Sequence, residues 1–72
     1  MEVRLFATLR GERDKVTKVE WQEGMDGYAL LAELDIAPED VSMFLINGMN
    51  SKPDTLLKAD DTIALFPPVG GG

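Results

Sequence analysis

Hydrophobic and polar residues alternate in several short stretches of this chain, which is the pattern of half-buried β-strands. Residues 2–9 form the first such stretch, and a charged turn separates them from a second predicted strand over residues 16–21. In residues 62–66, Ile63 and Leu65 point to one face and the residues between them point to the other. The alternation therefore predicts a hairpin at the start of the chain and a further strand near its end.

The middle of the chain predicts one helix, which runs to about residue 34. Asp26 is suited to precede its first turn, because an aspartate side chain accepts hydrogen bonds from the free N–H groups there. Its buried stripe is expected to consist of residues at helical spacing: Tyr28, Leu31, Ala32 and Leu34. Pro38 cannot stand inside a continued helix, so residues 36–40 are predicted to be a loop.

A second hairpin is predicted after this loop. Residues 42–46 form its first strand, and Asn47-Gly48 is the strongest turn signal in the sequence, because both residues tolerate positive φ. Residues 49–52 are expected to return as a short edge strand.

The connection to the last strand predicts a single helical turn and a bend. The turn covers residues 53–57, with Leu56 or Leu57 pointing inward. The bend covers residues 58–61, where Asp60-Asp61 can form the turn because aspartate tolerates a left-handed conformation better than most residues.

The order of predicted elements gives an α+β fold. Placing the first and last strands side by side as parallel centre strands under the helix produces a β-grasp, a mixed sheet of four to five strands packed on one helix. The helix supplies a right-handed return, so the topology violates no connection rule. We expect one domain, residues 1–66, followed by a flexible C-terminal Gly-Gly tail, residues 67–72.

Composition narrows the range of functions. The chain has thirteen acidic and seven basic residues among 72, and it contains no cysteine and no histidine. It therefore lacks disulfides, cysteine-bound iron–sulfur or zinc sites, and the usual general base. A net charge of −6 disfavours a nucleic-acid partner; the charge serves solubility or steers the chain toward a basic groove. Since no signal peptide or membrane-spanning run is visible, we expect a cytoplasmic protein that binds no membrane.

The last six residues begin with two conformationally restricted prolines and end with three glycines, which have no side chains. Pro67 and Pro68 hold the backbone near polyproline II geometry and cannot continue a strand. The glycines Gly70, Gly71 and Gly72 follow, and the only functional group among them is the α-carboxylate of Gly72. A carboxylate reacts once its oxygen becomes a leaving group, for instance as an acyl-adenylate. We therefore expect Gly72 to carry a transferable group, with glycines before it that fit a narrow channel because they lack Cβ.

The same residues carry a resemblance to a known family. Phe66-Pro67-Pro68-Val69 followed by Gly71-Gly72 resembles the end of the small subunit of molybdopterin synthase. More broadly, it resembles the sulfur-carrier family that includes the thiamine-pathway carrier. The opening Val3-Arg4-Leu5-Phe6-Ala7 and the later Ile46-Asn47 fit that family as well. The resemblance spans nearly the whole chain and is closest to the molybdopterin synthase small subunit.

This resemblance implies a ubiquitin-like β-grasp domain whose terminal glycine, here Gly72, is adenylated and converted to a thiocarboxylate. The sulfur is then donated in molybdopterin biosynthesis, the pathway of the molybdenum or tungsten cofactor. The implied partners are an adenylating, E1-like activating enzyme, which uses ATP, and the large subunit of the synthase or another sulfur acceptor. The chain itself is expected to be a carrier and no enzyme, to bind no cofactor and no metal, and to be a monomer when free.

Other functions stay open at this point. The same activation can serve a thiamine-type sulfur carrier, or a ubiquitin-like modifier that is joined to a lysine of another protein. A reading of a different class is a non-covalent β-grasp interaction module whose tail is incidental. An autonomous enzyme is disfavoured, because the sequence offers no convergent set of acid, base and nucleophile.

The expected partner interface lies at the base of the tail. Alternation places the aliphatic residues of the first and last strands under the helix, which leaves Phe6 and Phe66 on the opposite face. A soluble monomer rarely exposes a large aromatic cluster unless it is an interface. The resemblance assigns these positions to contacts with the activating enzyme and the large subunit. The complete predicted interface is Phe6, Met49, Phe66, Pro67, Pro68 and Val69.

Overall fold

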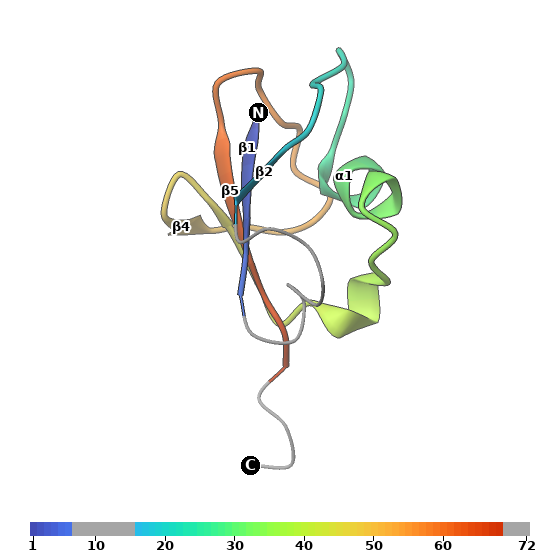
Figure 1. Ribbon diagram of the computed structural model, residues 1–72, viewed down its shortest axis with the longest axis vertical. Helices are drawn as coiled ribbons and strands as arrows, with labels where there is room; N and C mark the ends of the chain where they lie inside the picture. Colours follow the sequence, from blue (N-terminus) through green and yellow to red (C-terminus); the bar gives the residue numbers. More distant parts are fainter. Residues whose placement is uncertain (7–15, 69–72) are drawn as a thin grey trace.

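The computed structural model describes residues 1–6 and 16–68 (Figure 1). Within them the elements are β1 (Glu2–Leu5), β2 (Val16–Lys18), α1 (Gly27–Glu33), the 3-10 turn η2 (Pro38–Asp40), β3 (Met43–Ile46), β4 (Met49–Asn50) and β5 (Thr62–Phe66). The described strands form one sheet in the order β2-β1-β5-β3-β4. Only the pairing of β1 with β5 is parallel in this sheet. The predicted β-grasp, a mixed sheet packed on one helix with β1 and β5 as neighbours, is confirmed.

The first hairpin pairs over a shorter range than the alternation predicts. β2 ends at Lys18, although the backbones of Met1 and Val19 still exchange two hydrogen bonds, of 3.0 and 3.2 Å. Beyond Val19 the chain turns toward the helix, and the Trp21 indole Nε1 donates to the Leu57 carbonyl oxygen at 2.8 Å. The predicted strand residues 7–9 and the charged turn lie outside the described residues.

The second hairpin forms at the predicted turn. Asn47 and Gly48 have φ values of 53° and 82°, so both adopt the left-handed conformation that a two-residue hairpin turn requires. The returning strand β4 has only two residues and is shorter than the predicted 49–52. β5 covers the predicted residues, and pairs with β1 on one side and β3 on the other.

The core lies between α1 and one face of the central strands. Register places Val3 beside Ile63 and Leu5 beside Leu65, and all four side chains are fully buried. Burial of each such aliphatic side chain stabilises the fold by roughly 1.5–3 kcal/mol. The other buried hydrophobic residues complete this single core: Val19, Leu30, Leu31, Leu34, Ile36, Phe44 and Leu57.

The N-terminus of α1 is capped as predicted, but its buried face differs from the prediction. Asp26 accepts a hydrogen bond from the Ala29 N–H at 2.9 Å. The buried positions are Gly27, Leu30, Leu31 and Leu34, whereas Tyr28 is 49% exposed and Ala32 is also exposed. The predicted stripe was therefore wrong at two of its four members.

Gly27 explains why the helix buries a different face from the predicted one. A Cβ on Gly27 would lie 2.4 Å from the Pro53 carbonyl oxygen and 2.8 Å from Phe44 Cζ. Only a residue without a side chain allows this approach, and the next N–H, that of Tyr28, donates to the same Pro53 oxygen at 3.1 Å. The helix therefore packs against Pro53 and Phe44 through Gly27, and this orientation places Tyr28 at the surface.

The helix ends at an aspartate. Asp35 has φ 58°, the Ile36 N–H donates to Leu31 O at 2.9 Å, and the Asp35 N–H donates to Ala32 O at 3.1 Å. These two bonds make a Schellman motif, with Asp35 in the position usually held by glycine. Residues 36–40 then connect to β3 and include η2 within the predicted loop.

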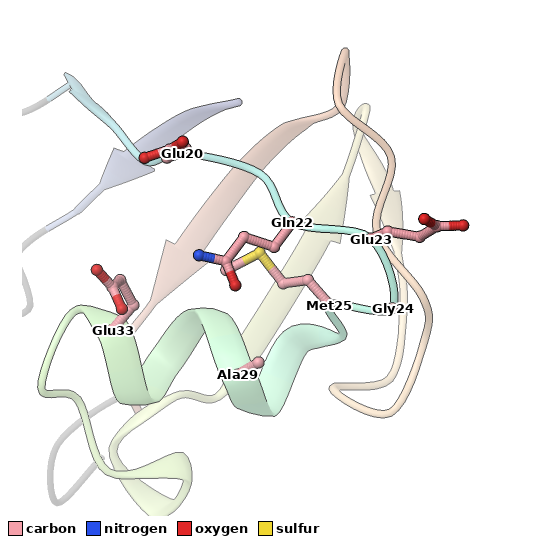
Figure 2. Close-up of a pocket in the computed structure, with 7 residues that line it drawn as sticks. All are labelled: Glu20, Gln22, Glu23, Gly24, Met25, Ala29 and Glu33. Atoms are coloured by element: carbon pink, nitrogen blue, oxygen red, sulfur yellow. The ribbon is translucent and has the colours of Figure 1, made fainter.

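The connection between β2 and α1 borders a hollow beside the helix. Its lining residues are Glu20, Gln22, Glu23, Gly24 and Met25 from the connection, and Ala29 and Glu33 from α1. Figure 2 shows the Gln22 and Met25 side chains lying between the connection and the helix, while Glu23 points away.

In residues 53–61 the structure differs from the predicted conformation in two places. The helical turn at 53–57 is a hydrogen-bonded turn without a helix, in which Leu57 is buried and Leu56 is 68% exposed. Neither Asp60 nor Asp61 is left-handed, since the described non-glycine residues with positive φ are Asp35 and Asn47. Asp61 is instead buried, and its carboxylate accepts from the Lys58 N–H at 2.8 Å. A side-chain hydrogen bond thus shapes the bend.

Candidate functional site on the outer face of the sheet

The sheet has two faces with different surroundings. One face packs against α1, and the other, which we call the outer face, has no helix over it in the described part of the chain (Figure 1). Successive side chains of a strand alternate between the faces. Because Val3, Leu5, Ile63 and Leu65 are buried under the helix, the residues between them lie on the outer face.

Phe6 and Phe66 lie together on this outer face. Their ring centroids are 4.3 Å apart and the rings are inclined by only 8°, so the rings stack. The backbone supports this placement, because the Phe6 N–H donates to Leu65 O at 3.2 Å and continues the pairing of β1 with β5. Both side chains are half-buried. The prediction that the two rings meet is confirmed, and such a pair is worth about 0.5–1.5 kcal/mol beyond its buried area.

Three residues of β3 and β5 extend this apolar surface. Met43 stands opposite Phe66, and Leu45 stands opposite Ala64, so all of them share the outer face. Met43 is 41% exposed, and Leu45 and Ala64 are half-buried. We call Phe6, Met43, Leu45, Ala64 and Phe66 the aromatic patch. Met43 and Leu45 were not predicted, although the period-two spacing of residues 43 and 45 in the predicted strand 42–46 was a signal for them.

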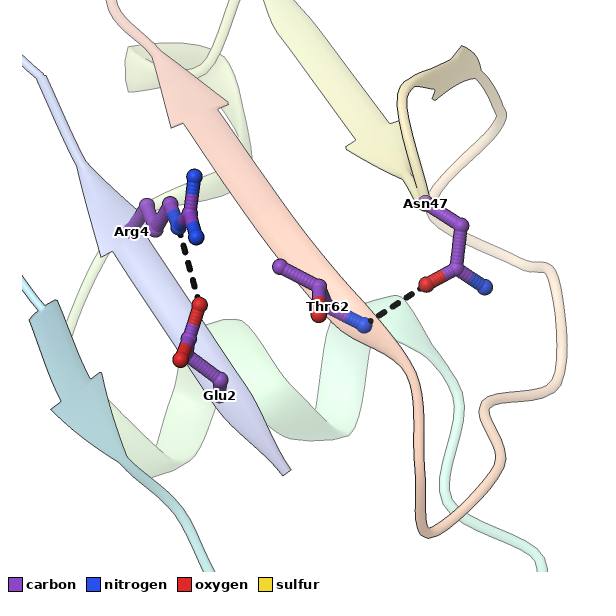
Figure 3. Close-up of polar contacts among 4 residues, drawn as sticks. All are labelled: Glu2, Arg4, Asn47 and Thr62. Carbon is purple, nitrogen blue, oxygen red and sulfur yellow. Dashed lines mark hydrogen bonds and ion pairs between the residues drawn. The ribbon is translucent and has the colours of Figure 1, made fainter.

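A positive charge borders the aromatic patch. Register places Arg4 between Val16 and Ala64, on the outer face. Its Nε lies 2.8 Å from the Glu2 carboxylate (Figure 3). Both side chains are well exposed, so this ion pair contributes roughly 0–1 kcal/mol to stability. The Arg4 guanidinium retains further donors that an acidic group on a partner can reach.

Polar contacts hold the opposite end of β5. The Thr62 N–H donates to Asn47 Oδ1 at 2.9 Å (Figure 3), and the Asn47 N–H donates to Thr62 O at 2.8 Å. Asn47 Nδ2 also donates to the Asp61 carboxylate at 2.9 Å. These contacts set the register of β5 against β3, and hence the point at which the chain leaves the sheet after Phe66.

The C-terminal segment leaves the sheet directly beside the aromatic patch. The Ser42 N–H donates to Phe66 O at 2.7 Å, which is the last contact of this strand with β3. Pro67 is half-buried and Pro68 is exposed. The remaining predicted site residues, Val69, Gly70, Gly71 and Gly72, lie outside the described residues.

Met49 lies apart from the aromatic patch. It pairs with Ile46, which stands opposite Ile63, a residue of the core face. Met49 is therefore in a row of the core face, at the edge of the sheet, where its side chain is 72% exposed. The structure does not join it to Phe6 and Phe66, because one residue of register moves a side chain to the other face.

The described residues offer docking surfaces and few reactive groups. Among residues 1–6 and 16–68, no group of three or more Asp or Glu side chains is arranged to hold a metal ion. Every buried side-chain nitrogen or oxygen found there has a hydrogen-bond partner. No helix within these ranges is long and apolar enough to cross a membrane.

Comparison with known proteins agrees with this picture. The model of the ThiS family matches residues 3–72. Among solved structures, the chain is similar to SAMP1 from Haloferax volcanii in its crystal structure, with a TM-score of 0.74 and 28% sequence identity. That similarity covers 99% of this chain and 97% of the other. A search of curated proteins finds no match.

Proposed function

Because this chain belongs to the ThiS family, the sulfur-carrier family of ubiquitin-like proteins, we propose that it carries sulfur as a thiocarboxylate on Gly72 and donates it in molybdopterin biosynthesis. The observation that supports this most is the aromatic patch beside Pro67. When a partner binds the aromatic patch, the C-terminal segment starts at a defined point of the partner's surface. The residues up to Gly72 would then extend from that point into the partner's active site.

The proposed chemistry takes place on the Gly72 carboxyl group, and the activating enzyme supplies the reactive groups. A carboxylate oxygen attacks the α-phosphorus of ATP, pyrophosphate leaves, and Gly72 becomes an acyl-adenylate. A sulfide nucleophile then attacks the carbonyl carbon and AMP leaves, which yields the thiocarboxylate; a persulfide donor gives the same product once a thiol has cleaved its S–S bond. Glycine suits both steps, because the absence of Cβ at Gly70 and Gly71 lets the backbone enter a narrow channel.

The proposed partners dock on the aromatic patch in turn. Binding energy in protein interfaces is concentrated in a few well-packed residues, often aromatic ones or arginine. Phe6 and Phe66 provide the aromatic anchors, and Arg4 beside them provides a charge that fixes orientation. The E1-like activating enzyme and the synthase large subunit would use the same surface, so they bind one after the other. The activating enzyme uses the ATP, and the proposed location of the reaction is the cytoplasm.

The proposal also specifies which pathway receives the sulfur. Phe6 and Pro67-Pro68 favour molybdopterin synthase over the thiamine pathway. A thiamine-type carrier would give the sulfur of the same Gly72 thiocarboxylate to another acceptor. In a protein modifier, a lysine amine would instead attack the activated Gly72 carbonyl carbon and form an amide, and the activating group would leave.

Intact-mass measurement of the protein from its own host tests the proposal. We expect a fraction of the molecules to carry the mass increase of sulfur in place of oxygen, located at Gly72 by fragmentation. Deleting Gly72 should abolish adenylation and leave the unfolding midpoint nearly unchanged, since the core ends with β5. Normal adenylation of the truncated protein would contradict the role of Gly72. Conversion of a thiazole precursor, or conjugation to lysine, would replace the molybdopterin assignment.

A further inference from the structure

A second surface of the molecule lies on the helix side of the sheet, away from the aromatic patch. It is the hollow between the chain that follows β2 and the helix α1 (Figure 2). Its lining includes apolar groups of Met25 and Ala29, and the carboxylates of Glu20 and Glu33 lie at its border, whereas Glu23 points away. The hollow is thus an open groove with apolar groups in its lining and an acidic rim.

The groove adjoins a free strand edge. The backbones of Met1 and Val19 exchange two hydrogen bonds, so this is a hydrogen-bonded pair of an antiparallel ladder. The ladder alternates, so Glu2 and Lys18 form the next, non-bonded pair, and the Lys18 N–H and C=O point away from β1. β2 is the last strand on that side of the described sheet. The backbone groups of Lys18 therefore face outward, as the edge of a sheet does before another strand is added.

The charged side chains that line this groove, Glu20, Glu23 and Glu33, are all acidic. The sequence has no lysine or arginine between Lys18 and Lys52. Seven acidic residues stand in that interval: Glu20, Glu23, Asp26, Glu33, Asp35, Glu39 and Asp40. Since the whole chain has a net charge of −6, the interval 19–51, which contains the lining residues of the groove, accounts for its acidity.

From the free edge, the apolar groups of the lining and the acidic rim together, we propose that this groove docks an extended basic segment of a partner protein. The segment pairs with the outward backbone groups of Lys18 and adds a strand beside β2. Its alternate side chains then point to the groove, where apolar ones contact Met25 and Ala29. Lysine or arginine side chains at its ends meet Glu20 and Glu33. Nucleic acid is excluded as the occupant because of the acidic rim.

This proposal is independent of the sulfur chemistry. The aromatic patch and the C-terminal segment lie on the outer face and at the end of β5, whereas the groove lies beside the helix. A partner can therefore hold the groove while the activating enzyme or an acceptor occupies the aromatic patch. Binding at the groove should persist in a protein that lacks Gly72, so the failure of one proposal leaves the other standing.

A short synthetic peptide with valines in its centre and arginine at both ends is the probe, and the same peptide with glutamate at both ends is its matched control. Titration into the full chain, followed by amide chemical shifts, should move the signals of Lys18 to Gln22 and of Met25 to Glu33. The arginine peptide should bind and the glutamate peptide should not. Exchange of Glu20 or Glu33 for glutamine should each raise the Kd about two- to fivefold, as expected for exposed ion pairs.

A substitution of the edge separates backbone pairing from charge. Lys18→Pro removes the outward N–H while keeping the hydrogen bonds to β1, and should weaken the peptide about tenfold. Lys18→Ala removes the same positive charge and should bind at least as well as the parent chain. Unchanged binding by folded Lys18→Pro, equal binding of the glutamate peptide, or shifts confined to the aromatic patch would each overturn the proposal. If Lys18→Pro does not fold, the two glutamine variants decide the outcome.

Discussion

Phe66 is the residue that links the sheet to the proposed docking function. It is the last residue of β5, it stacks on Phe6, and it stands opposite Met43. Its half-buried ring contributes to both stability and the exposed surface, so its two roles have to be separated by measurement.

Phe66→Ala should weaken the complexes with the activating enzyme and with the large subunit by about 2 kcal/mol or more, since aromatic anchors dominate such interfaces. The free energy of unfolding should fall less, by roughly the 0.5–1.5 kcal/mol of the lost stacking plus a partial loss of buried area. Calorimetric Kd values and urea unfolding measure the two effects. Met49→Ala is the control, because Met49 is exposed and lies off the patch. Equal Kd values for Phe66→Ala and the parent chain would exclude the patch as an anchor.

Gly27→Ala tests the seating of the helix. Alanine is intrinsically better than glycine in a helix by about 1 kcal/mol. The added Cβ, however, would lie 2.4 Å from a backbone oxygen of Pro53, which cannot move aside as a side-chain end can. We therefore expect a net loss of about 1–3 kcal/mol in the free energy of unfolding. Ala32→Gly, at an exposed helix position, measures the difference in helix propensity between alanine and glycine without such a contact. A more stable Gly27→Ala variant would show that the contact relaxes.

At the scale of elements, the bend before β5 depends on one buried carboxylate. Asp61 accepts hydrogen bonds from the Lys58 N–H and from Asn47 Nδ2, and Asn47 in turn accepts from the Thr62 N–H. The β3–β4 turn and the start of β5 are thus joined through side chains. Because β5 leads to the C-terminal segment, this network sets where that segment begins.

Asp61→Ala should therefore lower the free energy of unfolding by about 2–3 kcal/mol, since two donors lose a charged acceptor. The neighbouring Asp60→Ala, at an exposed position, should change it by at most about 0.5 kcal/mol. Chemical denaturation of both variants measures the difference. Equal stabilities would mean that water replaces the carboxylate without cost.

At the scale of the whole molecule, the acidic residues are concentrated in one interval of the chain. Between Lys18 and Lys52 there are seven acidic residues and no basic one, and three of the acidic residues line the groove beside the helix. On the outer face, the ion pair of Arg4 and Glu2 borders the aromatic patch.

If the net charge of −6 steers binding, association with the activating enzyme should slow as salt rises, while dissociation from the packed patch changes little. Stopped-flow rates across a salt series measure this. An association rate that is independent of ionic strength would leave the acidity with a role in solubility only.

The sequence alone determined the order of the elements, the β-grasp topology and the position of the Asn47-Gly48 turn. It also placed Phe6 and Phe66 on one face opposite the core. These features depend on local rules: strand alternation has a period of two, and a turn needs residues that tolerate positive φ. A resemblance carried by the terminal motif supplied the family, which the comparisons confirmed.

Only the tertiary structure decided which face of the helix is buried, because that depends on the contact of Gly27 with Pro53 and Phe44, far along the chain. The choice of Leu57 over Leu56 and the role of Asp61 as an acceptor were likewise set by partners in other elements. The tertiary structure also decided the face of Met49, because a two-residue strand has too little alternation to show its register. Local pattern thus fixes the faces of long strands, whereas short elements take their orientation from what they pack against.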